Sequence, residues 1–508
     1  MRIIKFWTSL VFLFLARSIY AGPEATAMAW FDLHKEQPSQ LRQFLQIMPK
    51  GADLHTHLTG AVYAETYIAI AKDLDFCVDN ASYRLHPSPC QDNGNEIPVR
   101  QISQDLYERM VDRYSTRNLD LSSRSGHDQF FESFSFIGAV AGQRKAHPVM
   151  ISEVANRAAK QNVILLELSI SLEGKALQNL SAGLGDINTD SLGEIRSKLL
   201  QSGIMELVNS GRANLDRAEG EYKNYMRCDK PDADQGCSVI IRYILQTNRN
   251  SSPSQVYAQL VYAFELAKAD PRVVGVGFVS PEDGNTAIND YDLHMQMIGY
   301  LHKTSPQVQI TLHAGELVPG LAKPEGLRNH ISSAVQIGGA NRIGHGVDLL
   351  YEDNAFNTLT YMKSHGVAAE ICLTSNDIIL NVRGNQSPLK TYLNAGVPVV
   401  LASDDEGVSR IDLTHEYLRA ATEHKLTYAQ LKQLSRNSLT WSFLSGPSIW
   451  EDPDSKKITS SCKNDREGRK LISKGCQQFL NSSEKARAQW RLEEAFVEFE
   501  SMPQWRQR

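Results

Sequence analysis

Histidines and carboxylates follow four apolar runs of the sequence, and they are the side-chain types that bind metal ions and transfer protons. The four segments are His55-Thr56-His57, His313-Ala314-Gly315-Glu316, Arg342-Ile343-Gly344-His345-Gly346 and Ser403-Asp404-Asp405. Residues i and i+2 of a strand point to the same side, so His55 and His57 can reach one ion. Gly315 lets the chain bend close to a ligand, because it has no side chain.

Adjacent carboxylates after an apolar strand are costly, because like charges repel and burial disfavours both anions. A divalent cation removes that cost for Asp404. Three neutral imidazole nitrogens and one carboxylate suit Zn²⁺, whereas calcium or magnesium would need mostly oxygen ligands. The sequence therefore predicts one Zn²⁺ per chain, bound by His55, His57, His313 and Asp404. His345 lies between two glycines that leave room around its ring, which suits a catalytic group.

The sequence has eight short apolar or β-branched runs, and four of these runs contain or lead into the segments above. Stretches with helical periodicity separate the runs. The runs are residues 52–58, 163–171, 239–246, 273–279, 308–316, 342–349, 367–375 and 398–404. Near-continuous apolar runs that alternate with helices are typical of a buried parallel sheet. Eight runs predict an α/β fold of the (β/α)₈ barrel type, in which functional side chains lie at the carboxyl ends of the strands. No Gly-x-Gly-x-x-Gly follows the first run, which argues against a dinucleotide-binding fold.

Uneven spacing of the runs predicts how the rest of the chain is organised. The gaps after the first and second runs exceed one crossover helix, so we expect insertions at about 70–160 and 172–237. The predicted barrel covers residues 48–445. A signal peptide at 1–21 and a helical arm at 22–47 precede it, and a helical extension at 446–508 follows it.

The first residues and the cysteines predict export to the periplasm or secretion. A basic start, an apolar run of signal-peptide length and small residues favour cleavage after Ala21, with Ala27 as the second choice. Six cysteines form three sequence-local couples in polar, turn-rich stretches, as expected for disulfides in an exported protein. The couples are Cys77/Cys90, Cys228/Cys237 and Cys462/Cys476, and Cys372 lies alone in an apolar run. No later segment is long and apolar enough to span a bilayer, so we expect no stable membrane insertion after cleavage.

The composition excludes several classes of protein. The chain has 508 residues, of which 42% are hydrophobic and 22% charged, which excludes a disordered, collagen-like or coiled-coil protein. Lys and Arg number 53 against 58 Asp and Glu, for a formal net charge of -5. That balance lacks the basic footprint of a nucleic-acid-binding protein, so we expect no nucleic-acid partner.

Taken together, the motifs resemble those of the adenosine deaminase family of metal-dependent amidohydrolases. The matching segments, in the family's order, are MPKGADLHTHL (48–58), HAGE (313–316), RIGHG (342–346), EICLTSN (370–376) and SDD (403–405). The apparent signal peptide, the long first insertion and its cysteine couple resemble the secreted, growth-factor-like branch of that family. The small net charge fits an uncharged purine nucleoside as substrate.

The resemblance implies hydrolytic deamination of adenosine, and of 2′-deoxyadenosine, to inosine and ammonia, with zinc activating the attacking water. His345 matches the histidine beside that water, and Glu316 matches the carboxyl group that donates a proton to N1 of the purine. Asp404 matches the metal-binding aspartate and counts with the catalytic residues. Asp405 would bond N7 of the ring, and Gly315 is expected beside the substrate.

Two departures from the family pattern leave the substrate open. Thr59 stands where the cytosolic branch has an aspartate that contacts the ribose. Ser280, followed by Pro281, aligns approximately with a glycine of the family whose backbone faces N3. The substrate can therefore be another 6-aminopurine, such as adenine or a modified adenosine. A third interpretation is an extracellular binding or growth-factor protein without catalysis. Residues 24–47 are either a dimer arm or a layer under the barrel, and the resemblance to the secreted branch favours a homodimer.

Overall fold

A computed structural model describes residues 22–91, 94–452, 457–465 and 472–506 of the chain. The predicted signal peptide, residues 1–21, lies outside the described residues. Among the described residues, no helix has the length and apolar character of a membrane span.

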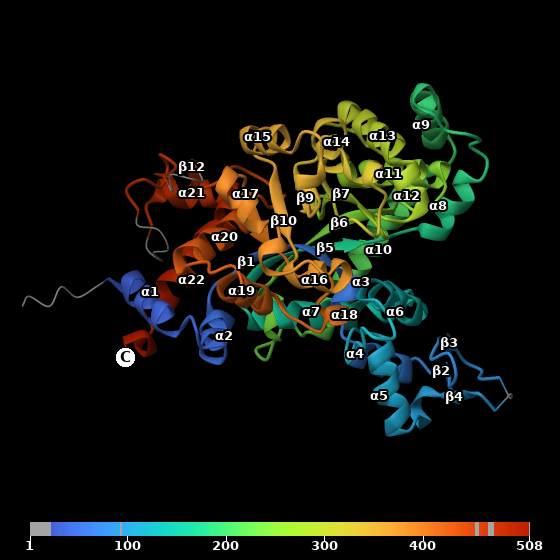
Figure 1. Cartoon of the computed structure of the whole chain (residues 1–508), viewed down its shortest axis with the longest axis horizontal. Coiled ribbons are helices and arrows are strands. Elements are labelled where there is room, and N and C mark those ends of the chain that lie inside the picture. Colours follow the sequence, from blue (N-terminus) through green and yellow to red (C-terminus); the bar gives the residue numbers. More distant parts are fainter. Residues whose placement is uncertain (1–21, 92–93, 453–456, 466–471, 507–508) are drawn as a thin grey trace, which may run out of the picture.

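Eight parallel strands form one sheet in the order in which they occur along the chain (Figure 1). They are β1 (Gly51–His57), β5 (Val163–Ile170), β6 (Ile240–Asn248), β7 (Val273–Val279), β8 (Gln309–Ala314), β9 (Arg342–His345), β10 (Ala368–Ile371) and β11 (Val399–Leu401). The amide of Asp404 donates to the carbonyl of His55 (2.9 Å), and the amide of His57 donates to the carbonyl of Asp404 (3.2 Å). These bonds join the two ends of the sheet, so the predicted (β/α)₈ barrel is confirmed.

Helices cover the outer face of the barrel because each buries one apolar side against the strands. In chain order they are α7 (His147–Lys160), α10 (Ile204–Tyr225), α11 (Pro253–Ala269), α13 (Tyr291–Thr304), α14 (His330–Gln336), α15 (Ala355–His365), α17 (Leu389–Ala395), α19 (Leu413–Thr422) and α20 (Tyr428–Thr440). The last of them, α20, packs on both β1 and β11 and covers the junction where the barrel closes.

Several strands are shorter than the predicted runs, among them β9, β10 and β11, and the end of β10 has a clear physical cause. The apolar run 367–375 forms β10 only as far as Ile371, and the helix α16 (Leu373–Leu380) then begins. The buried carboxylate of Glu416 accepts the free amides at the start of this helix, from Leu373 (2.6 Å) and Thr374 (3.2 Å). A helix needs such acceptors for its first amides, and here they come from a residue distant in the sequence.

Additional elements follow the first two strands. After β1 come α3 (Leu58–Ala61), α4 (Ala64–Asp73), a small antiparallel sheet of β2 (Phe76–Asp79), β3 (Leu85–Pro87) and β4 (Glu96–Pro98), then α5 (Gln104–Arg113) and α6 (Gly126–Ala141). Figure 1 shows this small sheet and α5 projecting from the barrel. After β5 come α8 (Gly174–Ser181) and α9 (Leu192–Gln201), before α10.

Disulfides join the three predicted cysteine couples, Cys77–Cys90, Cys228–Cys237 and Cys462–Cys476. Cys372 is free and buried. The third couple lies near the C-terminus, where the short strands β12 (Trp450–Asp452) and β13 (Lys457–Ile458) precede α21 (Lys474–Ser482) and α22 (Glu484–Glu500).

The N-terminal segment packs on its own chain. It forms α1 (Pro23–His34) and α2 (Pro38–Ile47), whose Phe31 and Phe44 are fully buried. Phe44 makes ring contacts with Tyr428 of α20 and with Phe499 of α22. Of the two arrangements predicted for residues 24–47, the structure shows the layer that packs on the same chain. Ala27, the second of the predicted cleavage positions, is buried within α1, whereas Ala21 lies outside the described residues.

Candidate metal centre and substrate pocket

Four predicted metal ligands converge at the carboxyl ends of the strands. The Nε2 atom of His313, in β8, lies 3.1 Å from Nε2 of His55 and 3.2 Å from Nε2 of His57, both in β1. Oδ1 of Asp404, just after β11, lies 3.3 Å from Nε2 of His57 and 3.6 Å from Nε2 of His55. One point is therefore surrounded by three imidazole nitrogens and one carboxylate oxygen.

The spacing of these atoms fits a tetrahedral metal ion. Ligands at about 2.0–2.1 Å from a tetrahedral ion lie about 3.3–3.4 Å from one another. The donor chemistry agrees, because three ring nitrogens this close cannot each carry a proton, and their lone pairs would otherwise repel. These residues therefore fit a divalent metal ion.

Polar side chains hold the ligands in this orientation, and two of them, Glu370 and Ser375, are buried. Nδ1 of His55 lies 2.7 Å from Oε2 of Glu370, and Nδ1 of His57 lies 2.9 Å from Oε1 of Gln246. The hydroxyl of Ser375 donates to the second oxygen of Asp404 (2.6 Å). Partners of this kind fix the tautomer and ring orientation of metal-binding histidines.

Glu370 belongs to an ion-pair network inside the barrel. Its other oxygen accepts from Arg342, whose Nη2 lies 2.7 Å from the carboxylate of Glu167, and all three side chains are fully buried. Burial alone would raise the pKa of Glu370, but Arg342 and His55 outweigh burial and lower it to about 2. Glu370 is therefore a carboxylate, which keeps the His55 ring oriented with its Nε2 toward the metal position.

His345, at the end of β9, points an unbonded nitrogen at the site. Its Nδ1 lies 2.9 Å from the side-chain oxygen of Asn376, whereas its buried Nε2 has no hydrogen-bond partner among the described residues. That Nε2 lies 3.8 Å from Oε1 of Glu316 and 3.9 Å from Oδ2 of Asp404. His345 and Asp404 have φ values of +66° and +60°, which are costly for side chains other than glycine and cluster at functional sites.

Hydrogen bonds made by its backbone fix the position of Glu316 at the pocket. The amides of Gly315 and Glu316 donate to the carboxylate of Glu282 (3.1 and 2.9 Å), which also pairs with His330. Gly315 has a φ of +76°, the left-handed conformation that glycine adopts without strain. Burial raises the pKa of Glu316 against the opposing influence of His345, which favours the protonated form of this carboxyl group.

Asp405 also faces the site as a buried acid. Its Oδ1 has no hydrogen-bond partner among the described residues. Burial and the neighbouring charge of Asp404 raise its pKa well above the usual range. Gly60 leaves the space it needs, because a Cβ atom there would lie within 1.6 Å of Oδ1.

A pocket of about 460 Å³ opens beside the metal position, a volume suited to a small ligand. Among its lining residues are all but two of the sequence-predicted side chains at this end of the barrel: His57, Thr59, Ser280, His313, Glu316, Asp404 and Asp405. His55 and His345 lie next to these residues but outside the lining. Ser280 has a φ of +83° and presents its carbonyl to Arg249, which donates to it from Nε (2.8 Å).

Several residues of the site were not predicted from the sequence. Glu370 and Gln246 lie inside apolar strands, Glu282 follows β7, and Phe130, Phe131 and Phe134 of α6 form an aromatic wall of the pocket. Glu370 is part of the segment 370–376 that resembles the family, which is the one signal that pointed to it.

Comparisons with known proteins agree with these motifs. A family model described as adenosine deaminase matches residues 99–451, a stretch that begins after β1 and contains the other segments of the site. An adenosine deaminase of Shewanella denitrificans is 38% identical over 137 residues, which are 27% of this chain and 38% of that relative. This match therefore spans less than half of the relative's length.

Solved structures share the fold at low identity. An adenine deaminase from Arthrobacter aurescens superposes with a TM-score of 0.51 at 18% identity, over 78% of this chain and 94% of the other. A zinc-bound amidohydrolase from Burkholderia ambifaria gives 0.52 at 17% identity, over 82% of this chain and 89% of the other. The adenosine deaminase family model covers more than half of this chain, and the chain therefore belongs to that family.

Proposed function

We propose that the protein is a zinc-dependent hydrolase that converts adenosine and water into inosine and ammonia. One observation carries the proposal: three imidazole nitrogens and a carboxylate converge beside a pocket into which a protonatable Glu316 points. Nitrogen-rich tetrahedral sites favour zinc over magnesium or calcium. When bound, zinc supplies a water that is acidic enough to react near neutral pH.

The chain's own side chains would move the protons and orient the ring. Glu316, whose pKa burial raises, donates a proton to N1 of the purine as water adds to C6. His345, with its free Nε2 facing Glu316 and Asp404, takes the proton of the attacking water. Asp405, whose pKa is raised by burial and by the charge of Asp404, donates to N7. His345 passes its proton to the departing amino group, ammonia leaves C6, and the proton of the new C6 hydroxyl returns to Glu316 as the carbonyl forms.

The residues of the pocket wall favour a 6-aminopurine as substrate, but they do not determine which substituents that purine carries. The aromatic side chains of α6 offer a stacking surface for a purine. Thr59, not an aspartate, lines the pocket, and Ser280 lines it from the turn after β7. We therefore propose adenosine and 2′-deoxyadenosine as substrates, with adenine or a modified adenosine as the second candidate. The three disulfides favour a periplasmic or secreted site of action.

A panel of 6-aminopurines tests the proposal. Purified, zinc-loaded protein is incubated with adenosine, 2′-deoxyadenosine, adenine and N6-methyladenosine, and the released amine and the product are measured. The proposal predicts inosine and ammonia in equal amounts from adenosine. Turnover of another member of the panel but not adenosine would support the second candidate. Turnover of none would favour a binding protein without catalysis.

A further inference from the structure

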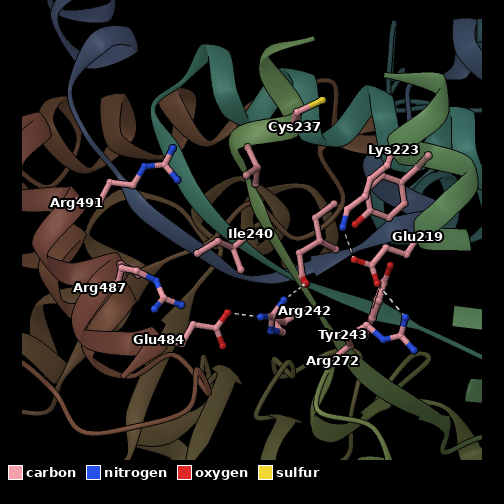
Figure 2. Close-up of a pocket in the computed structure, with 14 residues that line it drawn as sticks. Glu219, Lys223, Cys237, Ile240, Arg242, Tyr243, Arg272, Glu484, Arg487 and Arg491 are labelled. Carbon is pink, nitrogen blue, oxygen red and sulfur yellow. Dashed lines mark hydrogen bonds and ion pairs between the residues drawn. The ribbon is translucent and has the colours of Figure 1, made fainter. Parts of the chain in front are cut away.

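A second pocket, of about 500 Å³ (Figure 2), lies at the amino-terminal end of β6, the end of the barrel away from the metal centre. Its residues come from α10, the first half of β6 and the segment before it, Arg272 just before β7, and α22. Within β6, Arg242 and Tyr243 line this pocket, whereas Gln246 lines the substrate pocket. The nearest of these residues, Tyr243 and Gln246, are three positions or about 10 Å apart along the strand, and the two pockets share no lining residue, so they are separate sites.

The second pocket is cationic, although the whole chain carries a net charge of -5. Five cationic side chains line it together with two carboxylates: Lys223, Arg242, Arg272, Arg487 and Arg491, with Glu219 and Glu484. Figure 2 shows Arg487 and Arg491 on one side of the pocket and Lys223 with Glu219 on the other. An anion between them would meet positive charge from two directions.

The two carboxylates are already paired. Glu484 forms an ion pair with Arg242. Glu219 accepts from Nζ of Lys223 (2.5 Å) and from Nη1 of Arg272 (2.9 Å). These pairs hold the three cations in place but leave the remaining two guanidinium groups uncompensated within the pocket.

Those two guanidinium groups lie one turn apart on α22. The guanidinium of Arg487 forms no hydrogen bond or ion pair within the part of the chain that the structure describes, and that of Arg491 donates to the carbonyl of Ser238 (2.8 Å). Side chains at i and i+4 of a helix project from the same face. Two adjacent guanidinium groups offer a fork of donors that matches the oxygens of a phosphate group.

Two tyrosines add hydroxyl groups to the lining of the pocket. Tyr222 and Tyr243 are only 7% and 3% exposed, and neither hydroxyl forms a hydrogen bond within the described residues. Glu219, Arg242 and Arg272 are the charged groups that act on both, so both hydroxyls face this pocket. Burial raises the pKa of Tyr222 to about 12, so its hydroxyl remains a donor.

We propose that this pocket binds a phosphorylated small molecule. Guanidinium, ammonium and hydroxyl donors recognise the phosphate oxygens. The pocket is larger than a phosphate group alone, and Val239, Ile240 and Ala488 supply an apolar surface for the organic part of the ligand. The site is independent of the proposed deaminase activity, because it shares no lining residue with the substrate pocket.

Calorimetric titration with uridine diphosphate tests the site, because this probe carries phosphate groups but no 6-aminopurine. The full mature protein is expected to bind one uridine diphosphate per chain and no uridine, at constant ionic strength. Arg487→Ala/Arg491→Ala is expected to weaken that binding at least tenfold, while adenosine turnover stays unchanged. Both residues are exposed and helical, and alanine is the strongest helix former, so this variant keeps the fold. Tyr222→Phe should weaken binding as well.

The matched control is Arg100→Ala/Arg328→Ala, which removes two exposed arginines far from this pocket. It is expected to bind uridine diphosphate like the unmodified protein. Absence of saturable binding would overturn the proposal, as would equal affinity for uridine, an unchanged affinity in Arg487→Ala/Arg491→Ala, or an equal loss in the control. Adenosine turnover measured on the same samples reports separately on the proposed catalytic function.

Discussion

Replacing Glu370 with glutamine tests whether a buried carboxylate prepares His55 for the metal. One oxygen of Glu370 lies 2.7 Å from Nδ1 of His55, and the other accepts from Arg342 and from the hydroxyl of Thr311 (2.9 Å). Glutamine has the same shape but only one acceptor oxygen, so it can serve His55 or Arg342 but not both.

Two effects of different size are expected in Glu370→Gln. Loss of the partner of a metal-binding histidine weakens metal affinity about 10–100-fold, or about 1.4–2.7 kcal/mol. Loss of one carboxylate from the fully buried pair with Arg342 lowers the free energy of unfolding by about 3–5 kcal/mol. Competition with a chromophoric zinc chelator measures the first effect, and unfolding in urea measures the second.

Glu167→Gln provides the matched control. Glu167 pairs with the same Arg342 (2.7 Å) and accepts from the amide of Phe443 (2.6 Å), but it makes no hydrogen bond to His55. This variant should lose a similar amount of stability and keep the metal affinity of the unmodified protein. The reasoning is refuted if Glu370→Gln binds zinc normally, or if Glu167→Gln weakens zinc binding by the same factor.

Three further variants probe the site and its aromatic wall. His313→Ala should lose both metal and activity, and stoichiometric zinc by elemental analysis would rule out its role as a ligand. Glu316→Gln should keep zinc but lose about 10²–10⁴-fold in turnover, because it cannot donate the proton; near-normal rates would exclude Glu316 as the acid. The third variant concerns the ion pair between His127 of α6 and Asp283 (3.2 Å), which raises the pKa of His127 above 6.5. This contribution to stability is complete below pH 6.5 and is lost as the pH rises through the raised pKa. In His127→Gln, hydrogen exchange in α6 should therefore be faster than in the unmodified protein at low pH and equal at high pH; a difference of the same size at both would contradict this.

The strands and the metal ligands could be predicted because both depend on local patterns. Each strand of the barrel is a short apolar run, and the residue that ends it lies at the functional face. The i, i+2 spacing of His55 and His57 follows from the alternation of a strand. Asp404 could be grouped with them because the first and last strands of a closed barrel are neighbours, as the backbone bonds between His55 and Asp404 show.

The residues that support the ligands could not be predicted, because their role depends on packing. Glu370 and Gln246 lie within apolar strands, where no local pattern marks them. Only closure of the barrel brings them to His55 and His57. The aromatic side chains of α6 lie more than 70 residues after β1, where no local pattern relates them to the pocket. The end of β10 at Ile371 depends on Glu416, whose carboxylate reaches back across 43 residues to Leu373.

Zinc titration of the metal-free protein during adenosine turnover tests whether the protein deaminates adenosine with one bound zinc ion. The account predicts that inosine and ammonia appear in equal amounts and that the rate rises with bound zinc until one ion per chain is present. A protein that binds one zinc at this site and forms no inosine from adenosine would contradict it.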